Sequence, residues 1–156
     1  NNFADQYDIQ LSLAGNIADS SIEKIKITAP KIITENKGYL SHKEAIALMK
    51  SGDLLLNFIF KGADQDMISG KLLEYLATGV PVLSIGDAQS EAGRFLTTAS
   101  FAKMIPASKT SALKTFIDKA AQQKGKAKND MPEIKKWSRE NITAILHDIL
   151  ETLNAW

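Results

Sequence analysis

Short apolar runs alternate along the chain with longer stretches in which apolar residues recur every three or four positions. The short runs end in glycine, proline or polar residues, so each of them predicts a β-strand. They cover residues 9–15, 32–40, 53–60, 80–86 and 101–107. The longer stretches predict helices at residues 20–29, 41–52, 69–79, 90–99 and 109–123, and one long amphipathic helix at 132–156.

Two of the predicted strands, "DLLLNFIF" and "VPVLSIG", are apolar at nearly every position. A strand covered on one face would alternate between apolar and polar residues, so these runs indicate burial on both faces, as in a parallel sheet. Strands separated by helices imply repeated βαβ units. We therefore expect an α/β fold, a Rossmann-like doubly wound parallel sheet with helices on both faces and a long C-terminal helix.

The helix predicted at residues 41–52 has clear signals at both ends. Ser41 is followed three residues later by Glu44, which is the capping-box spacing, and Gly52 follows the last apolar residue of the stripe. In doubly wound sheets, ligands bind beyond the carboxyl ends of the strands. The loops that follow the predicted strands, near residues 15–16, 38–41, 60–70 and 86–90, are therefore the places to look for a site.

Composition and charge narrow the class of protein. The chain has 156 residues, of which 44% are hydrophobic and 24% charged, so it suits one folded domain with a core and argues against disorder. Its net charge of +1 gives no bias toward nucleic acid, which we do not expect as a partner. The chain has no cysteine, which excludes disulfides and thiolate chemistry and fits a reducing compartment. Its apolar runs are too short to span a bilayer, and no signal peptide stands out.

The start of the helix at residues 69–79 carries an unusual charge. Ser69 can cap this helix, which leaves the backbone N–H groups of Gly70, Lys71 and Leu72 as donors. A lysine in the first turn faces the positive end of the helix dipole, which is unfavourable by ~0.3–1 kcal/mol unless an anion is present. Two interpretations stay open: a diphosphate across the helix N-terminus with a sugar hydroxyl held by Glu74, or a surface Lys71–Glu74 pair without a ligand.

The apolar residues of the same helix predict which side is buried. On a wheel of 3.6 residues per turn, a single stripe faces the core and leaves Lys71 and Glu74 on the other side. The predicted stripe consists of Leu72, Leu73, Leu76 and Ala77.

Other motifs are weak. "GADQDMISGKL" is not a P-loop, because seven residues separate Gly62 from Gly70 and Leu72 stands where Ser or Thr would hold magnesium. The "DQD" at residues 64–66 has the form of an Asp-x-Asp manganese motif, but a three-residue match is common in polar loops. His42 and His147 have no evident catalytic partner. We therefore predict no metal site.

Three segments resemble the carboxyl-terminal domain of GT-B-fold glycosyltransferases of the group 1 family: "GYLSHKEAIALMKSGDLLLNF", "SGKLLEYLATGVPVLSIG" and "SEAGRFL". The likeness runs from about Ile9 to Leu96, is looser around "KKWSRENI", and is most specific in "KLLEYLATGVPVL". Enzymes of this family are retaining transferases that use nucleotide-sugar donors. The resemblance implies that residues 1–156 form a single domain, the donor-binding half of a two-domain bacterial enzyme that is cytoplasmic or peripheral at the inner membrane face.

The resemblance also implies roles for individual residues. The family carries two acidic residues separated by seven positions, and "DMISGKLLE" places Asp66 and Glu74 at that spacing. Asp66 would be the catalytic residue near the donor sugar, and Glu74 would bind the ribose hydroxyls of a UDP- or GDP-sugar. The backbone around Ser69, Gly70 and Lys71 would meet the diphosphate or the sugar. The remaining donor-binding residues would be Gly38, Tyr39 and Leu40 near the base, and Gly15 and Asn16 at a strand end facing the same cleft.

Two departures from the family pattern bear on function. Asp66 stands where the family usually has a longer glutamate. The family's first strand, whose loop clamps the phosphates with an Arg and a Lys, would precede Asn1, as would the acceptor-binding N-terminal domain, the expected partner. We expect this chain alone to be inactive and to need no cofactor beyond the donor substrate. Two alternatives stay open: a domain like that of the sugar-nucleotide 2-epimerases, or a non-catalytic regulatory or interaction module.

Overall fold

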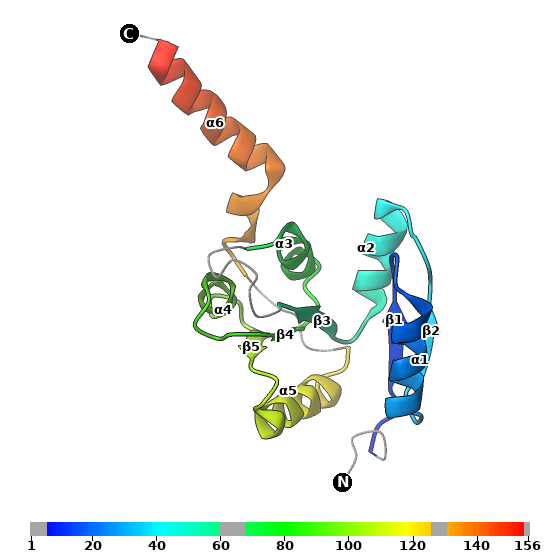
Figure 1. Ribbon diagram of the computed structural model, residues 1–156. Coiled ribbons are helices and arrows are strands. Elements are labelled where there is room, and N and C mark those ends of the chain that lie inside the picture. The colour runs from blue at the N-terminus through cyan, green and yellow to red at the C-terminus, as the bar shows by residue number, and fades with distance from the viewer. Residues whose placement is uncertain (1–5, 60–67, 126–130, 155–156) are drawn as a thin grey trace. The chain divides into compact units, whose positions relative to one another are not determined.

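The computed structural model describes residues 6–59, 68–125 and 131–154 (Figure 1). All strand pairs in it are parallel, and helices follow the strands along the chain, so the predicted α/β class is confirmed. The strands form two sheets, one with two strands and one with three. The chain also divides into two compact units, Asn1–Leu48 and Met49–Trp156, and each is described by itself. That the two units form a single domain stays a prediction.

The first unit contains the two-stranded sheet. β1 (Gln10–Leu13) pairs in parallel with β2 (Ile33–Asn36), and α1 (Asp19–Thr28) connects them. α1 packs on β2 and buries Ile22, which is the residue that its modest apolar side presents to the sheet. α2 (His42–Ser51) then begins with the predicted capping box. Ser41 Oγ and the Ser41 backbone N–H both donate to Glu44 Oε2, at 2.6 Å and 2.8 Å.

The second unit contains the three-stranded sheet, in the order β3-β4-β5. Its strands are β3 (Leu55–Phe58), β4 (Val82–Ile85) and β5 (Ala102–Ile105). The helices between and after them are α3 (Gly70–Ala77), α4 (Glu91–Leu96) and α5 (Thr110–Gln122). Each helix thus joins or follows parallel strands, as the alternating sequence pattern predicts.

Both faces of this sheet are covered, because successive strand side chains point to opposite sides. Val82 and Met104 pack on one face with residues of α3 and α4, including Leu76 and Leu96. Leu83 and Ile105 pack on the other face with Phe116 of α5. Figure 1 shows α3 and α4 on one side of the strands and α5 on the opposite side. This double coverage explains why the β4 sequence is apolar at almost every position.

The polar residues of β3 and β4 form one buried pair. The register places Asn57 directly beside Ser84, and Asn57 Nδ2 donates to Ser84 Oγ at 2.8 Å. Asn57 is 6% exposed and Ser84 is fully buried. Each side chain thus satisfies the other inside an otherwise apolar layer.

The C-terminal segment differs from the single helix predicted from Pro132 onward. It consists of a short 3₁₀ helix, η2 (Ile134–Trp137), and then α6 (Arg139–Asn154). Ser138 lies between them with an extended backbone (φ −64°, ψ 146°), and its hydroxyl accepts a hydrogen bond from the Asn141 N–H at 3.1 Å. Ser138 therefore caps a new helix where the sequence pattern predicted continuity.

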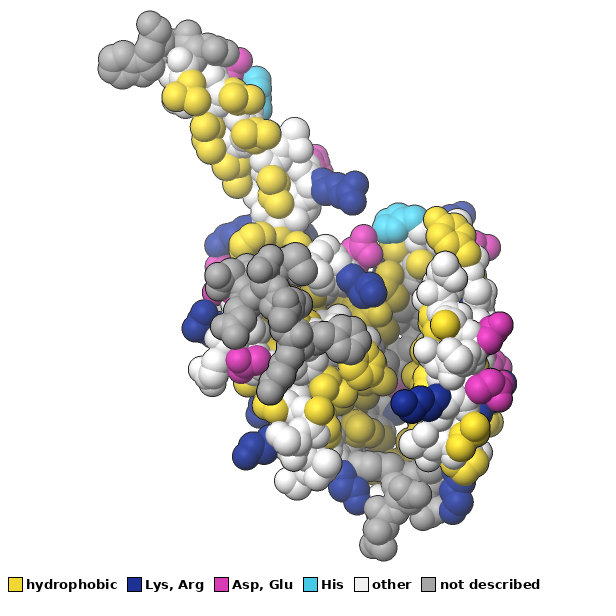
Figure 2. Space-filling view, viewed as in Figure 1, with side chains coloured by type: hydrophobic (Ala, Val, Ile, Leu, Met, Phe, Trp, Pro, Cys, Tyr) yellow, Lys and Arg dark blue, Asp and Glu magenta, His cyan; other side chains and the backbone are white. Residues whose placement is uncertain are grey.

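η2 is held to the unit by an aromatic contact, whereas α6 presents an apolar face to solvent. The rings of Phe95 and Trp137 meet edge to face with centroids 5.4 Å apart. Figure 2 shows hydrophobic side chains gathered along one side of α6. The large apolar residues of α6 that are at least 46% exposed are Ile142, Ile145, Leu146, Ile149, Leu150 and Leu153. None of the helices in the described part of the chain is long and apolar enough to cross a membrane.

Candidate functional site

The best-defined part of the predicted site is the N-terminus of α3. Ser69 is its N-cap, with an extended backbone (φ −72°, ψ 146°), and Ser69 Oγ accepts a hydrogen bond from the Leu72 N–H at 3.3 Å. The Leu72 N–H also donates to the Ser69 carbonyl oxygen at 3.0 Å. The cap fixes where α3 begins and satisfies one backbone N–H of its first turn.

This arrangement corrects one expectation about the donors. Leu72 was predicted to keep a free backbone N–H, but Ser69 already accepts it. The N–H groups of Gly70 and Lys71 find no acceptor in the described residues, as expected for the first turn of a helix. A Cβ built on Gly70 would meet none of the described atoms within 4 Å, so a ligand atom could approach the Gly70 backbone from that direction. Among the described residues, the first turn of α3 thus keeps two backbone donors unused.

Lys71 and Glu74 both lie on the exposed side of α3. They are three residues apart and could form an ion pair, yet within the described part of the chain neither forms one. The ion pair that would support a surface Lys71–Glu74 pair without a ligand is thus not formed. Both side chains are accessible to a ligand from solvent.

The buried side of α3 includes Tyr75 in place of Ala77, one of the four residues of the predicted stripe. Leu72 and Leu76 are buried as expected, at 0% and 2% exposure, but Ala77 is exposed. Tyr75 is half-buried instead and packs against the core cluster. Burial raises the pKa of the Tyr75 hydroxyl, and the neighbouring Glu74 carboxylate raises it further. Tyr75 was not part of the predicted stripe.

In the first unit, the loops after β1 and β2 come together. The Gly15 N–H donates to the Gly38 carbonyl oxygen at 2.8 Å, and the Gly38 N–H donates to Asn36 Oδ1 at 3.0 Å. Gly15 has φ +115° and Gly38 has φ +64°, which side-chain-bearing residues rarely adopt. The two glycines therefore give this loop pair its conformation.

The other predicted residues of these loops differ in exposure. Tyr39 is 89% exposed, so its ring is free to stack on a planar group. Asn16 is exposed and Leu40 is half-buried. The structure thus brings Gly15 and Gly38 into contact at the carboxyl ends of paired strands, with Tyr39 beside them in sequence.

The predicted site residues therefore fall into two sets, one in each unit. Ser69, Gly70, Lys71 and Glu74 share one end of α3, whereas the glycine loops belong to the first unit. Asp66, the predicted catalytic residue, lies outside the described residues together with the rest of the "DQD" motif.

No group of three or more His, Cys, Asp or Glu side chains that could hold a metal ion occurs among the residues described. Comparison with known proteins adds no relative: no protein-family model matches the chain, and no curated protein matches it.

Proposed function

We propose that this chain is the donor-binding domain of a retaining glycosyltransferase that takes its sugar from a nucleotide diphosphate. One observation carries the proposal. The open first turn of α3 offers the N–H groups of Gly70 and Lys71, the Lys71 ammonium and the Glu74 carboxylate from a single end of one helix. The resemblance of "SGKLLEYLATGVPVL" to the group 1 family supports the same assignment.

Each of these groups has a chemical role in the proposal. The helix N-terminus and Lys71 hold the diphosphate, whose negative charge grows as the sugar departs. Glu74 accepts hydrogen bonds from the ribose hydroxyls. Transfer also needs an acceptor-binding domain, the expected partner of this one, so these 156 residues by themselves transfer nothing. We place the enzyme in the bacterial cytoplasm or at the inner membrane face.

Titration of UDP- and GDP-sugars into the isotope-labelled chain tests this proposal. We expect amide chemical-shift changes at Gly70 and Lys71 that weaken with salt, because the contact is electrostatic. Glu74→Ala should weaken binding by ~1–3 kcal/mol, the range for an unpaired polar partner, with the melting temperature nearly unchanged. Glu151→Ala, which removes another exposed helical glutamate, is the matched control.

The outcomes separate the alternatives. If no nucleotide sugar moves the Gly70 and Lys71 amides, the proposal fails and the non-catalytic module is favoured. If Glu74→Ala binds the donor as well as the wild type, the assignment of Glu74 to the ribose is wrong. If the 156 residues transfer sugar by themselves, this domain holds more than the donor half of the site.

A further inference from the structure

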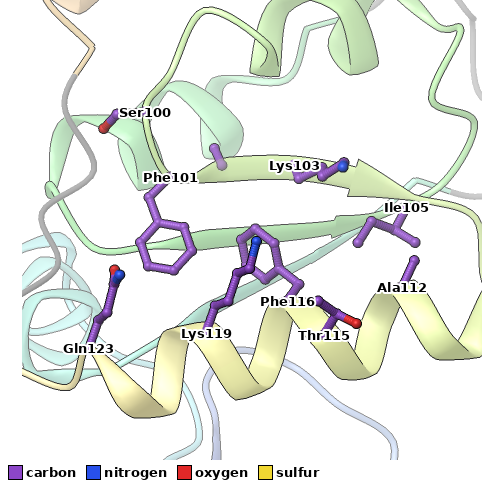
Figure 3. A pocket seen from close by; sticks show the side chains of 10 residues that line it. Ser100, Phe101, Lys103, Ile105, Ala112, Thr115, Phe116, Lys119 and Gln123 are labelled. Carbon is purple, nitrogen blue, oxygen red and sulfur yellow. The ribbon is translucent and has the colours of Figure 1, made fainter.

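A hollow of about 700 Å³ lies between β5 and α5, away from the N-terminus of α3 (Figure 3). Phe101, Lys103 and Ile105 line it from the strand side, and Thr115, Lys119 and Gln123 line it from the helix. The helical residues lie beside the buried Phe116 and the partly buried Leu113 and Ile117, which pack on the sheet. The hollow is therefore a groove along the outer side of the strand–helix contact.

The groove runs along both of the elements that form it, β5 and α5. On the strand side it is lined by β5 from Ala102 to Ile105, about 10 Å at ~3.3 Å per residue, and by Ser100 and Phe101 of the preceding turn. On the helix side it runs from Ala112 to Gln123, about 16 Å at ~1.5 Å per residue. An extended chain of about five residues spans a length of ~16 Å. The shape suits a peptide segment lying parallel to the strand.

The groove reaches the edge of the sheet. β5 is the last strand of its sheet within the described residues. The carbonyl oxygens of Phe101 and Ile105 accept from Val82 and Gly86, so these residues turn their backbone toward β4. Ala102, between them, turns its N–H and C=O away from β4. Its side chain packs on the opposite face of the sheet, so it lines the groove with its backbone.

The groove carries positive charge over an apolar floor. Lys103 and Lys119 are both exposed, and neither forms an ion pair in the part of the chain that the structure describes. Figure 3 shows Lys119 rising from α5 toward the strands. Beneath the lysines, the rings of Phe101 and Phe116 meet with centroids 5.2 Å apart. A carboxylate-bearing segment with an apolar side chain complements this combination.

We propose that this groove binds an extended acidic peptide segment of about five residues, which adds to the edge of β5. One residue of the segment pairs with the backbone N–H and C=O of Ala102. Its carboxylates pair with Lys103 and Lys119, and an apolar side chain on the same side rests on Phe101 and Phe116. The competing explanation is that Lys103 guards the edge against self-association, since lysine commonly has this role on edge strands.

The test uses the whole 156-residue chain and a fluorescein-labelled peptide, Glu-Ser-Leu-Ser-Glu, which presents two carboxylates and one leucine on the same side when extended. The matched probe is Lys-Ser-Leu-Ser-Lys. We expect saturable binding of the acidic peptide alone, measured by fluorescence anisotropy. The double variant Lys103→Glu/Lys119→Glu should weaken binding at least tenfold. Lys109→Glu, at the start of α5 but outside the groove, should change it less than twofold.

Strand pairing has its own readout. Hydrogen exchange of the Ala102 amide should slow at least threefold when the acidic peptide is bound, because that N–H gains an acceptor. The proposal is overturned if the acidic peptide does not bind, if the basic probe binds equally well, or if the double variant binds like the wild type. It is also overturned if the Lys103→Ala variant self-associates in sedimentation and the wild-type chain binds neither peptide. Lys103 then serves to prevent self-association through the edge of β5.

Discussion

The Asn57–Ser84 pair allows a sharp test of how β3 and β4 are aligned. Ser84→Ala removes one oxygen atom from a fully buried position and leaves the Asn57 Nδ2 donor without its acceptor. The lost volume is small, so a cavity contributes little. Leaving a buried polar group unpaired costs ~1–3 kcal/mol, and we expect the free energy of unfolding to fall by that amount.

Removing both polar groups should cost less than the two single changes suggest. Asn57→Leu is close to isosteric and leaves the Ser84 hydroxyl unpaired, so it too should cost ~1–3 kcal/mol. The double variant Asn57→Leu/Ser84→Ala has no orphaned group. We expect it to be more stable than the sum of the single effects by ~0.5–3 kcal/mol, the usual coupling between residues in contact.

Urea unfolding followed by circular dichroism measures these differences. Midpoints should shift at an unchanged slope, and a loss of 1 kcal/mol should lower the melting temperature by ~2–4 °C in a chain of this size. Ser111→Ala, an exposed serine on α5, is the control and should stay within ~0.5 kcal/mol of the wild type. A fully stable Ser84→Ala variant, or strict additivity in the double variant, would refute the pairing and with it the register of β3 on β4.

Three further predictions follow from local geometry. Gly93→Ala should destabilise the chain by ~1–3 kcal/mol in thermal unfolding, because its Cβ would lie 2.5 Å from the Ala88 carbonyl oxygen; Gly70→Ala, in open space, should not. The Ser41 hydroxyl lowers the pKa of Glu44, so the stabilisation by this cap is complete above the ordinary pKa of 4.5 and is lost as pH falls through the lower folded value. The gap in unfolding free energy between wild type and Glu44→Ala should therefore shrink below about pH 4.5, and a pH-independent gap would contradict the cap. EDTA should leave donor binding unchanged in calorimetry, because a helix N-terminus holds a diphosphate without a metal; strict manganese dependence would favour the "DQD" motif.

The sequence pattern predicts most of the fold because burial on both faces leaves a strong signal. The runs "DLLLNFIF" and "VPVLSIG" become β3 and β4, which the structure covers with helices on either side. The capping box at Ser41 is equally readable, because its two side chains satisfy each other locally and need no distant partner. Strands buried on both faces and caps formed by neighbouring side chains are thus features that can be predicted from the sequence.

Features that depend on packing are harder to predict. The period of α3 shows that one side is buried, but not whether Tyr75 or Ala77 completes it, because neighbouring elements set the rotation of the helix. Ser138 breaks the last helix although apolar residues continue on both sides of it, so the periodicity gives no warning. At the candidate site, the cap at Ser69 was predictable, whereas a capping serine can accept the N–H of either Lys71 or Leu72, and only the structure shows that it accepts that of Leu72.

The break at Ser138 has a consequence for how the chain opens. α6 packs mainly on η2, and its large apolar side chains are about half exposed, so little burial opposes its unravelling. Its amides should exchange with solvent through local opening of α6, without unfolding of the sheet. The amides of β4, enclosed by two layers of helices, should exchange only when the whole second unit unfolds. Ser138 thus separates two segments that should exchange their amide hydrogens differently: α6 exchanges quickly through local opening, and the sheet of the second unit exchanges slowly.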